Sequence, residues 1–211
     1  MLQNMGAFLS IISDGYLLQF KSLRVKMNVF IKRRMLMPKR IPDLDSRILS
    51  LSRQTLLEQG YNALSMRTLA AQCGVAVGTL YNYYPSKDAL VARLILDDWQ
   101  QMLQRMAEAA EGQFSLSEGL GELCRILEGF TARYRSVWAQ YGGGRAVGYT
   151  AKSHITLRQQ LAQPLETVLE ANGRRDLLPL SGVLAETMLS CALNPDLGSH
   201  QFALLASTWM R

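Results

Sequence analysis

Between residues 43 and 90, hydrophobic positions recur at helical spacing in short segments that are separated by turn residues. Ile48, Ser52 and Leu56 fall at i, i+4 and i+8, which places all three on one face of a helix. Gly60 is a helix stop signal. We therefore expect a first helix over about residues 43–59 that braces the segments after it.

The next segment predicts a second, shorter helix. Ser65 is a good N-cap, because its hydroxyl can accept from an unpaired backbone N–H. Leu69, Ala70 and Cys73 then provide one buried face. Gly74 can adopt the left-handed conformation that ends a helix.

A third helix is expected over Val77–Tyr83. Leu80 and Tyr84 are spaced i, i+4 to pack back on the second helix. This leaves Val77, Thr79, Asn82 and Tyr83 less constrained by packing. Two short helices that meet at a turn containing glycine describe a helix-turn-helix. In that motif the second helix enters the major groove of DNA.

The side chains on this third helix suit a groove. Val77 can meet a thymine methyl group, and Thr79 and Asn82 can bond to base edges or phosphates. Tyr81 and Tyr83 carry hydroxyls on rigid rings that can reach the DNA backbone. The exposed Arg67, at the start of the second helix, is either a DNA contact or a solvated arginine.

Lys87 is expected at the first position of a fourth helix, after the N-cap Ser86. A cation there is disfavoured by the helix dipole, by roughly 0.3–1 kcal/mol. A bound phosphate would reverse this penalty. The alternative is a solvated surface lysine. The candidate DNA-contacting residues are Ser65, Arg67, Val77, Thr79, Tyr81, Asn82, Tyr83 and Lys87.

The segment GVAVGTLYNYYPSKDAL, residues 74–90, resembles the signature of the TetR/AcrR family of bacterial transcriptional repressors. The resemblance extends upstream to Arg47. Three residues depart from the family pattern. Ala76 stands where a serine cap is usual, Tyr84 replaces a Phe and needs a partner for its hydroxyl, and Ala89 replaces a common Glu. None of them breaks the motif.

From residue 87 onward the pattern stays helical and carries no strand signal. A long helix over residues 87–111 is expected to belong to two domains and to link them mechanically. Further helices are expected over residues 115–140, about 150–171 and 180–193, and from residue 199. The predicted fold is all-α, with an N-terminal three-helix helix-turn-helix domain joined by the long helix to a C-terminal bundle.

The resemblance implies roles for this C-terminal domain. It implies a small-molecule pocket there and a homodimer formed by the last two helices. The pocket candidates, each also interpretable as plain core, are Trp99, Met102, Met106, Phe130, Tyr134 and Trp138. The apolar residues of the last two helices, which fit a dimer face or an internal core, are Leu184, Met188, Cys191, Phe202, Leu205 and Trp209.

The charge of the chain is unevenly distributed. The net charge is +6, yet residues 1–40 hold eight Lys and Arg against one acid, and residues 41–90 hold four of each. The basic excess therefore lies outside the predicted motif. DNA binding must depend on the placement of a few residues.

Residues 1–40 are mixed apolar and basic, and three interpretations stay open. They form a disordered basic arm that binds DNA, a membrane-surface segment, or sequence before a true start of synthesis at Met37. We favour the last. The expected domains are thus an N-terminal extension 1–40, a DNA-binding domain 41–90, and an effector-binding and dimerisation domain 91–211.

Other chemistry finds little support in the sequence. The three cysteines lie far apart and show no metal-ligand spacing, which favours free, mostly buried thiols in a reducing cytoplasm. We expect no catalytic residues, no metal site and no cofactor. No apolar run is expected to approach the ~20 residues of a membrane span, so we expect no stable membrane association.

The favoured function is a cytoplasmic repressor that binds a double-stranded DNA operator as a homodimer and is released by an unknown small-molecule effector. The alternative is a DNA-binding regulator that responds to no ligand or to a partner protein. An enzyme is disfavoured, because no nucleophile–base pair or carboxylate dyad occurs.

Overall fold

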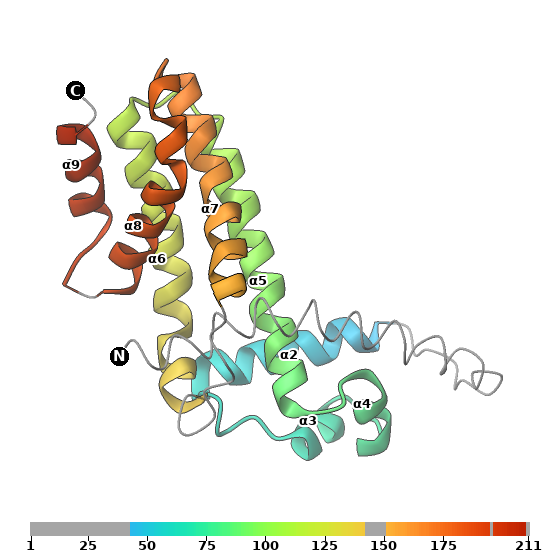
Figure 1. The fold of residues 1–211 in the computed structure, drawn as a ribbon. Helices are drawn as coiled ribbons and strands as arrows, with labels where there is room; N and C mark the ends of the chain where they lie inside the picture. The colour runs from blue at the N-terminus through green and yellow to red at the C-terminus, as the bar shows by residue number, and fades with distance from the viewer. Residues whose placement is uncertain (1–42, 142–150, 195, 210–211) are drawn as a thin grey trace. The chain divides into compact units, whose positions relative to one another are not determined.

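The computed structural model describes residues 43–141, 151–194 and 196–209. The predictions for residues 1–40, and the placement of the Trp138 side chain, lie outside the described residues. All elements in the described ranges are helical, which confirms the all-α prediction for them (Figure 1). The helices are α2 Leu44–Gln59, α3 Met66–Gln72, α4 Val77–Tyr83, α5 Lys87–Ala110, α6 Leu116–Tyr141, α7 Ala151–Ala171, η1 Arg175–Leu180, α8 Ser181–Leu193 and α9 Ser199–Trp209.

The chain forms two compact units. The first comprises residues up to Leu96 together with Ser136–Ser153, and the second comprises Asp97–Arg135 and His154–Arg211. Helices α5 and α6 therefore each contribute to both units. The division into domains predicted from the sequence stays a prediction.

In the first unit, α2 braces the short helices α3 and α4 as expected. Ile48, Ser52 and Leu56 are buried along one face of α2, and the Ser52 hydroxyl donates to the Ile48 carbonyl oxygen at 2.6 Å. That bond satisfies the one polar group in the stripe. Leu69 of α3 and Leu80 of α4 are also buried, so the three helices share one small core.

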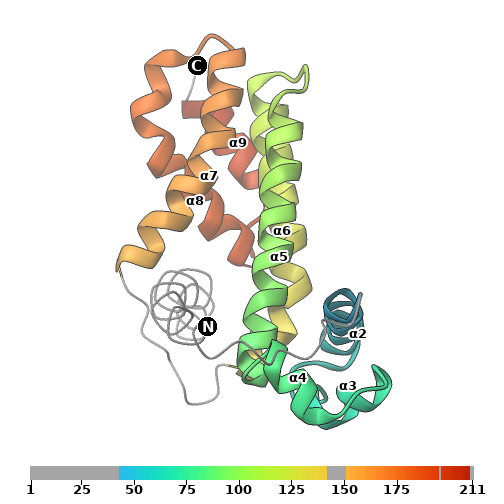
Figure 2. The same ribbon diagram turned by 90° about the vertical axis from the view of Figure 1, so that its right-hand side faces the viewer.

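In the second unit, α6 is bonded to α8 at two points. The Thr131 hydroxyl donates to the Ala192 carbonyl oxygen at 2.7 Å, and the Cys124 thiol lies 4.0 Å from the Met188 carbonyl oxygen. The Ser181 hydroxyl of α8 donates to Glu166 of α7 at 2.6 Å. Figure 2 shows α7 and α8 as neighbours in this bundle, with α9 following α8.

The segment before α8 is assigned to none of the expected helices, yet it is helical in the structure. Residues Arg175–Leu180 form the 3₁₀ helix η1, which includes Pro179 and leads directly into α8. The stretch Arg175–Leu193 has the length and apolar composition of a membrane span, with a mean hydropathy of 1.3. The expectation that no apolar run approaches this length is corrected here. The stretch joins two helices, seven of the thirteen α8 residues are buried, and 39% of the apolar stretch is buried inside the protein.

The residues proposed for a dimer face are largely internal. Leu184, Met188, Cys191 and Phe202 are buried within the second unit, so they are core residues of one chain. Leu205 is 37% exposed. The side chain of Trp209 is not among those described. A helix that is apolar on most of its surface buries one face internally, and sequence periodicity did not separate the two faces.

The three cysteines are free and buried. Burial raises the pKa of the Cys73, Cys124 and Cys191 thiols, and nearby Glu128 raises the pKa of the last two further. Protonated buried thiols are poor nucleophiles. The burial agrees with the expectation of free, mostly buried thiols.

Candidate nucleic-acid interface

The turn between α3 and α4 is closed by two backbone hydrogen bonds. The Gly74 N–H donates to the Ala71 carbonyl oxygen at 3.0 Å, and the Val75 N–H donates to the Ala70 carbonyl oxygen at 3.0 Å. Gly74 adopts a φ of +67°, in the left-handed region that favours glycine. This pattern is a Schellman motif, which ends α3 and redirects the chain into α4.

The start of α3 is capped as predicted. The Ser65 hydroxyl accepts from the Thr68 backbone N–H at 3.4 Å, and Ser65 has an extended backbone. Ala76 precedes α4 and offers no side-chain cap, which confirms the weaker start expected for that helix.

Helix α4 is anchored by the side chains on one face only. Leu80 is fully buried, and the buried Tyr84 donates its hydroxyl to Asp45 of α2 at 2.7 Å. The hydroxyl that distinguishes Tyr84 from the phenylalanine usual in the family pattern therefore has a hydrogen-bond partner, as a buried hydroxyl requires. These contacts fix the orientation of α4 within its unit, because the face opposite to Leu80 packs against no other helix among the described residues of the unit.

None of the predicted DNA-contacting residues is buried. Val77 is 41% exposed and Tyr81 is 47% exposed. Ser65, Arg67 and Asn82 are exposed, and Thr79, Tyr83 and Lys87 are half-buried. The structure thus leaves on the surface every side chain that the interface would use, on α4 and at the starts of α3 and α5.

Lys87 is held by neighbours that the sequence did not reveal. Ser86 caps α5, because its hydroxyl accepts from the Ala89 N–H at 3.0 Å, so Lys87 is the first helical residue. The Lys87 ammonium lies 4.0 Å from the centre of the Tyr61 ring. The Tyr61 hydroxyl donates to Asp88. Burial lowers the pKa of Lys87, and the Asp88 charge opposes this shift.

The end of α6 also contacts the helix-turn-helix part of the first unit. The Asn62 backbone N–H donates to the Gln140 side-chain oxygen at 3.1 Å. A Cβ placed on Gly60 would lie 2.5 Å from the Gln140 side chain, and Gly60 has a φ of +86°. Gly60 is therefore needed both for its backbone conformation and for this close approach. No local pattern links residues this far apart in sequence.

Five of the six predicted effector residues have described side chains, and all five are buried: Trp99, Met102, Met106, Phe130 and Tyr134. Trp99 meets Phe130 edge-on, with ring centroids 5.4 Å apart, and Phe130 lies 5.3 Å from Tyr134. The structure brings these three rings together into one cluster. They form part of the packed interior of the second unit.

Polar groups border this cluster. The buried Asp98 accepts from the Tyr134 hydroxyl at 2.7 Å and lies 3.3 Å from the Arg133 guanidinium. The Trp99 indole N–H donates to Gln160 at 2.9 Å. Asp98 and Gln160 could not be singled out from the sequence, because neither differs in type or spacing from the polar residues on exposed helix faces.

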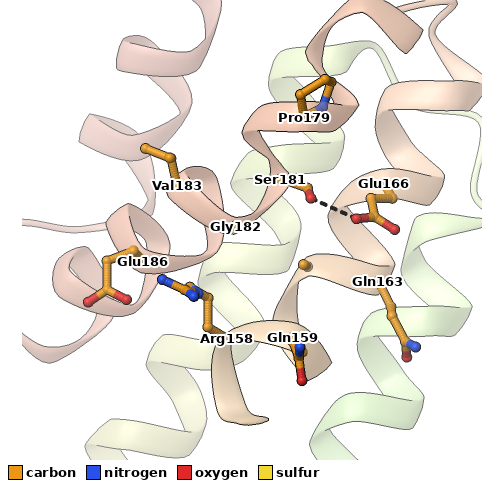
Figure 3. Close-up of a pocket in the computed structure, with 10 residues that line it drawn as sticks. Arg158, Gln159, Gln163, Glu166, Pro179, Ser181, Gly182, Val183 and Glu186 are labelled. Atoms are coloured by element: carbon orange, nitrogen blue, oxygen red, sulfur yellow. Dashed lines mark hydrogen bonds between the residues drawn. The ribbon is translucent and has the colours of Figure 1, made fainter. Parts of the chain in front are cut away.

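A separate groove of about 550 Å³ lies between α7 and α8 (Figure 3). The Arg158 side chain crosses it close to Gly182, where a Cβ would lie 3.8 Å from Nε. None of the five predicted effector residues with described side chains lines this groove. Its lining residues are Arg158, Gln159, Ala162, Gln163, Glu166, Pro179, Ser181, Gly182, Val183 and Glu186.

The helix-turn-helix segment matches a known family. Residues 48–94 match the model of the bacterial regulatory proteins of the tetR family. The chain is 37% identical over 67 residues to the HTH-type transcriptional regulator UidR of Escherichia coli, covering 32% of this chain and 34% of UidR. It is 37% identical over 59 residues to the HTH-type transcriptional repressor KstR of Rhodococcus jostii, covering 28% of each protein. The match thus spans about a third of the length of these curated relatives.

The fold is also similar to a solved structure. A transcriptional regulator of the TetR/AcrR family from Thermobifida fusca aligns with a TM-score of 0.53 and 18% identity. The alignment covers 80% of this chain and 96% of that protein. At this identity the likeness establishes the fold alone, and it extends well beyond the helix-turn-helix segment.

Proposed function

We propose that the chain is a TetR-family protein, on the match of its helix-turn-helix segment, and that it is a sequence-specific DNA-binding transcriptional regulator. DNA binding is assigned to residues 41–90, and effector binding and dimerisation to residues 91–211. Residues 1–40 are an N-terminal extension. The protein acts in the cytoplasm, where its operator DNA lies.

One observation carries the proposal. Helix α4 is fixed from one side by Leu80 and by the Tyr84–Asp45 hydrogen bond, while Val77, Tyr81 and Asn82 remain exposed on it. A rigid helix with a free polar and apolar face can read base edges in the major groove. Arg67 and Lys87 flank this helix and would bind phosphates, which fix register but carry no sequence information.

A second copy of the chain is the expected protein partner. Large apolar residues remain exposed on η1, α8 and α9: Leu180 at 48%, Val183 at 63%, Leu204 at 58% and Leu205 at 37%. Burying such residues against a second copy is favourable, and a two-fold dimer would place two α4 helices on successive half-sites.

The regulator is a repressor that a small molecule releases from its operator. KstR, which matches the helix-turn-helix segment, is named a repressor. The effector would bind in the second unit, near the aromatic cluster of Trp99, Phe130 and Tyr134, where Asp98 and Gln160 supply polar groups. Release requires that the effector bind the conformation with lower DNA affinity more tightly.

The DNA-binding proposal is tested with a duplex selected from a random-sequence library by the purified protein. The triple variant Thr79→Ala, Tyr83→Ala, Lys87→Ala should lose the gel shift on this duplex, while Gln163→Ala, on an exposed position of α7, should retain it. A triple variant that binds the selected duplex as well as the wild type rejects this interface.

The effector proposal is tested on the same complex. A small-molecule library is screened by thermal shift of the free protein, since a ligand that binds the folded state raises the melting temperature by mass action. A true effector should also release the protein from the selected duplex. A ligand that stabilises the protein and leaves the DNA complex intact contradicts the release mechanism.

A further inference from the structure

We propose that Tyr61 is a positioning residue, which holds the Lys87 ammonium in place for a DNA phosphate and is itself held by Asp88. The inference rests on the proposed function and deepens it, because it assigns a role to two residues outside the predicted interface. Tyr61 lies in the connection between α2 and α3, and Lys87 begins α5.

The first step is the contact between cation and ring. The Lys87 Nζ atom lies 4.0 Å from the Tyr61 ring centroid, well inside the roughly 6 Å range of a cation–π interaction. Both side chains are half-buried, so the contact is partly shielded from water. The Asp88 charge also acts on Lys87 and favours its charged form, which is the form that a cation–π contact requires.

The second step is the orientation of the ring. The Tyr61 hydroxyl donates to Asp88, the residue after Lys87 in the first turn of α5. This bond ties the far end of the ring to the same helix turn that carries the lysine. A ring held at both its face and its hydroxyl has little freedom to move away from Lys87.

The third step is what this arrangement does for binding. A free lysine side chain samples many rotamers, and ordering it on binding a phosphate costs free energy. The Tyr61 ring restricts Lys87 before DNA arrives. An ammonium has three donors, so one face can rest on the ring while the remaining N–H groups reach a phosphate.

A double-mutant cycle tests the positioning role on the selected duplex. Tyr61→Leu should weaken binding about three- to tenfold per half-site, the cost of ordering one long side chain. In the Lys87→Met background, which keeps a similar stem and removes the charge, Tyr61→Leu should have no further effect. Equal weakening by Tyr61→Leu in both backgrounds, or in neither, overturns the proposal. Circular dichroism of each variant checks that the fold is retained, and Tyr61→Phe serves as a second variant that keeps the ring.

A pair of variants of equal charge tests Asp88. Asp88→Asn keeps an acceptor for the Tyr61 hydroxyl, whereas Asp88→Ala does not, and both remove the same negative charge. The Asn variant should bind the duplex more tightly than the Ala variant. Equal affinities overturn the role of Asp88.

A nuclear magnetic resonance measurement on the free protein separates this inference from the proposed function. The Lys87 side-chain methylene resonances should be shifted upfield by the Tyr61 ring current, and Tyr61→Leu should remove the shift. Unshifted wild-type resonances overturn the inference and leave DNA binding by α4 standing. If Lys87→Met leaves DNA affinity and its salt dependence unchanged, both the phosphate contact and the positioning role are wrong.

Discussion

The two units use their side chains in opposite ways. In the helix-turn-helix, Leu80 and Tyr84 anchor α4, and Tyr81 and Asn82 between them are exposed. In the second unit, Trp99, Phe130 and Tyr134 are themselves the packing of the bundle. The exposed residues of α4 therefore contribute little packing to their domain, whereas the proposed effector residues form the core of theirs.

This difference has a consequence for how each site can respond. A surface helix can bind DNA with little change in its own unit, because its contacts are already exposed. A ligand that enters the aromatic cluster must displace or rearrange buried side chains, since close-packed interiors leave little free volume. Effector binding in the second unit is thus expected to be coupled to a change in helix packing.

The largest expected effect contrasts a core ring with an interface residue. Phe130→Ala should lower the free energy of unfolding by about 3–5 kcal/mol, because it opens a cavity between Trp99 and Tyr134. Asn82→Ala, at an exposed position, should change it by less than about 0.5 kcal/mol. Urea denaturation measures both. Similar losses of unfolding free energy at the two positions would contradict the conclusion that the aromatic cluster stabilises its unit and the exposed α4 residues do not.

The next effect concerns two glycines of the helix-turn-helix. A Cβ on either Gly74 or Gly78 would meet no atom within 4 Å, so only the backbone distinguishes them. Gly74→Ala should cost about 1–2 kcal/mol, because φ is +67°. Gly78→Ala, within helix α4, should stabilise the protein by up to about 1 kcal/mol. In thermal denaturation, Gly74→Ala should lower the melting temperature and Gly78→Ala should raise it. Changes of the same sign would contradict the turn geometry.

A smaller effect is expected where α4 meets α2. Tyr84→Phe removes the hydroxyl that donates to Asp45 and keeps the ring, so it should cost about 1 kcal/mol. The loss should vanish in the Asp45→Ala background, where the hydroxyl has already lost its acceptor. Urea denaturation of the four proteins closes this cycle, and an undiminished loss would show that the bond does not stabilise the fold.

The smallest effect is a pH dependence at the start of α6. Glu118 accepts from the Ser115 hydroxyl and backbone N–H, and these bonds lower the pKa of Glu118 below its ordinary value. Since the folded-state pKa is the lower one, the stabilisation is present above the ordinary glutamate pKa of 4.5 and is lost as the pH falls through the lowered folded-state pKa. Melting temperatures of wild type and Glu118→Gln should converge in acid. A constant difference between pH 3 and 6 would contradict this capping interaction.

Local signals explain how much of the fold could be predicted. Ser65, Gly74 and Ser86 act on their own neighbours in sequence, and the helix bounds they predicted agree with the structure within two residues. The Ser115–Glu118 capping box is also a local signal, but the sequence analysis did not identify it. The 3₁₀ helix η1 falls outside the predicted helices, because Pro179 and the residues before it show no helical periodicity of apolar positions.

Long-range contacts explain what could not be predicted. The Tyr61 ring contacts Lys87 although α3 and α4 lie between the two residues in the sequence. The Asn62–Gln140 bond spans 78 residues. Whether Trp99 packs in the core or lines a pocket depends on the side chains of the other helices that face it. The spacing of apolar residues along its own helix is the same in both cases, so the sequence does not distinguish them.

Crosslinking to DNA tests the central claim most directly. A photoreactive amino acid is placed at position 82 on α4 and, as a matched control, at position 163 on α7, both of which are exposed. Irradiation with the selected duplex should crosslink the protein through position 82 and leave position 163 uncrosslinked. Crosslinking through position 163 alone, or to the same extent at both positions, would contradict the assignment of α4 as the helix that reads DNA.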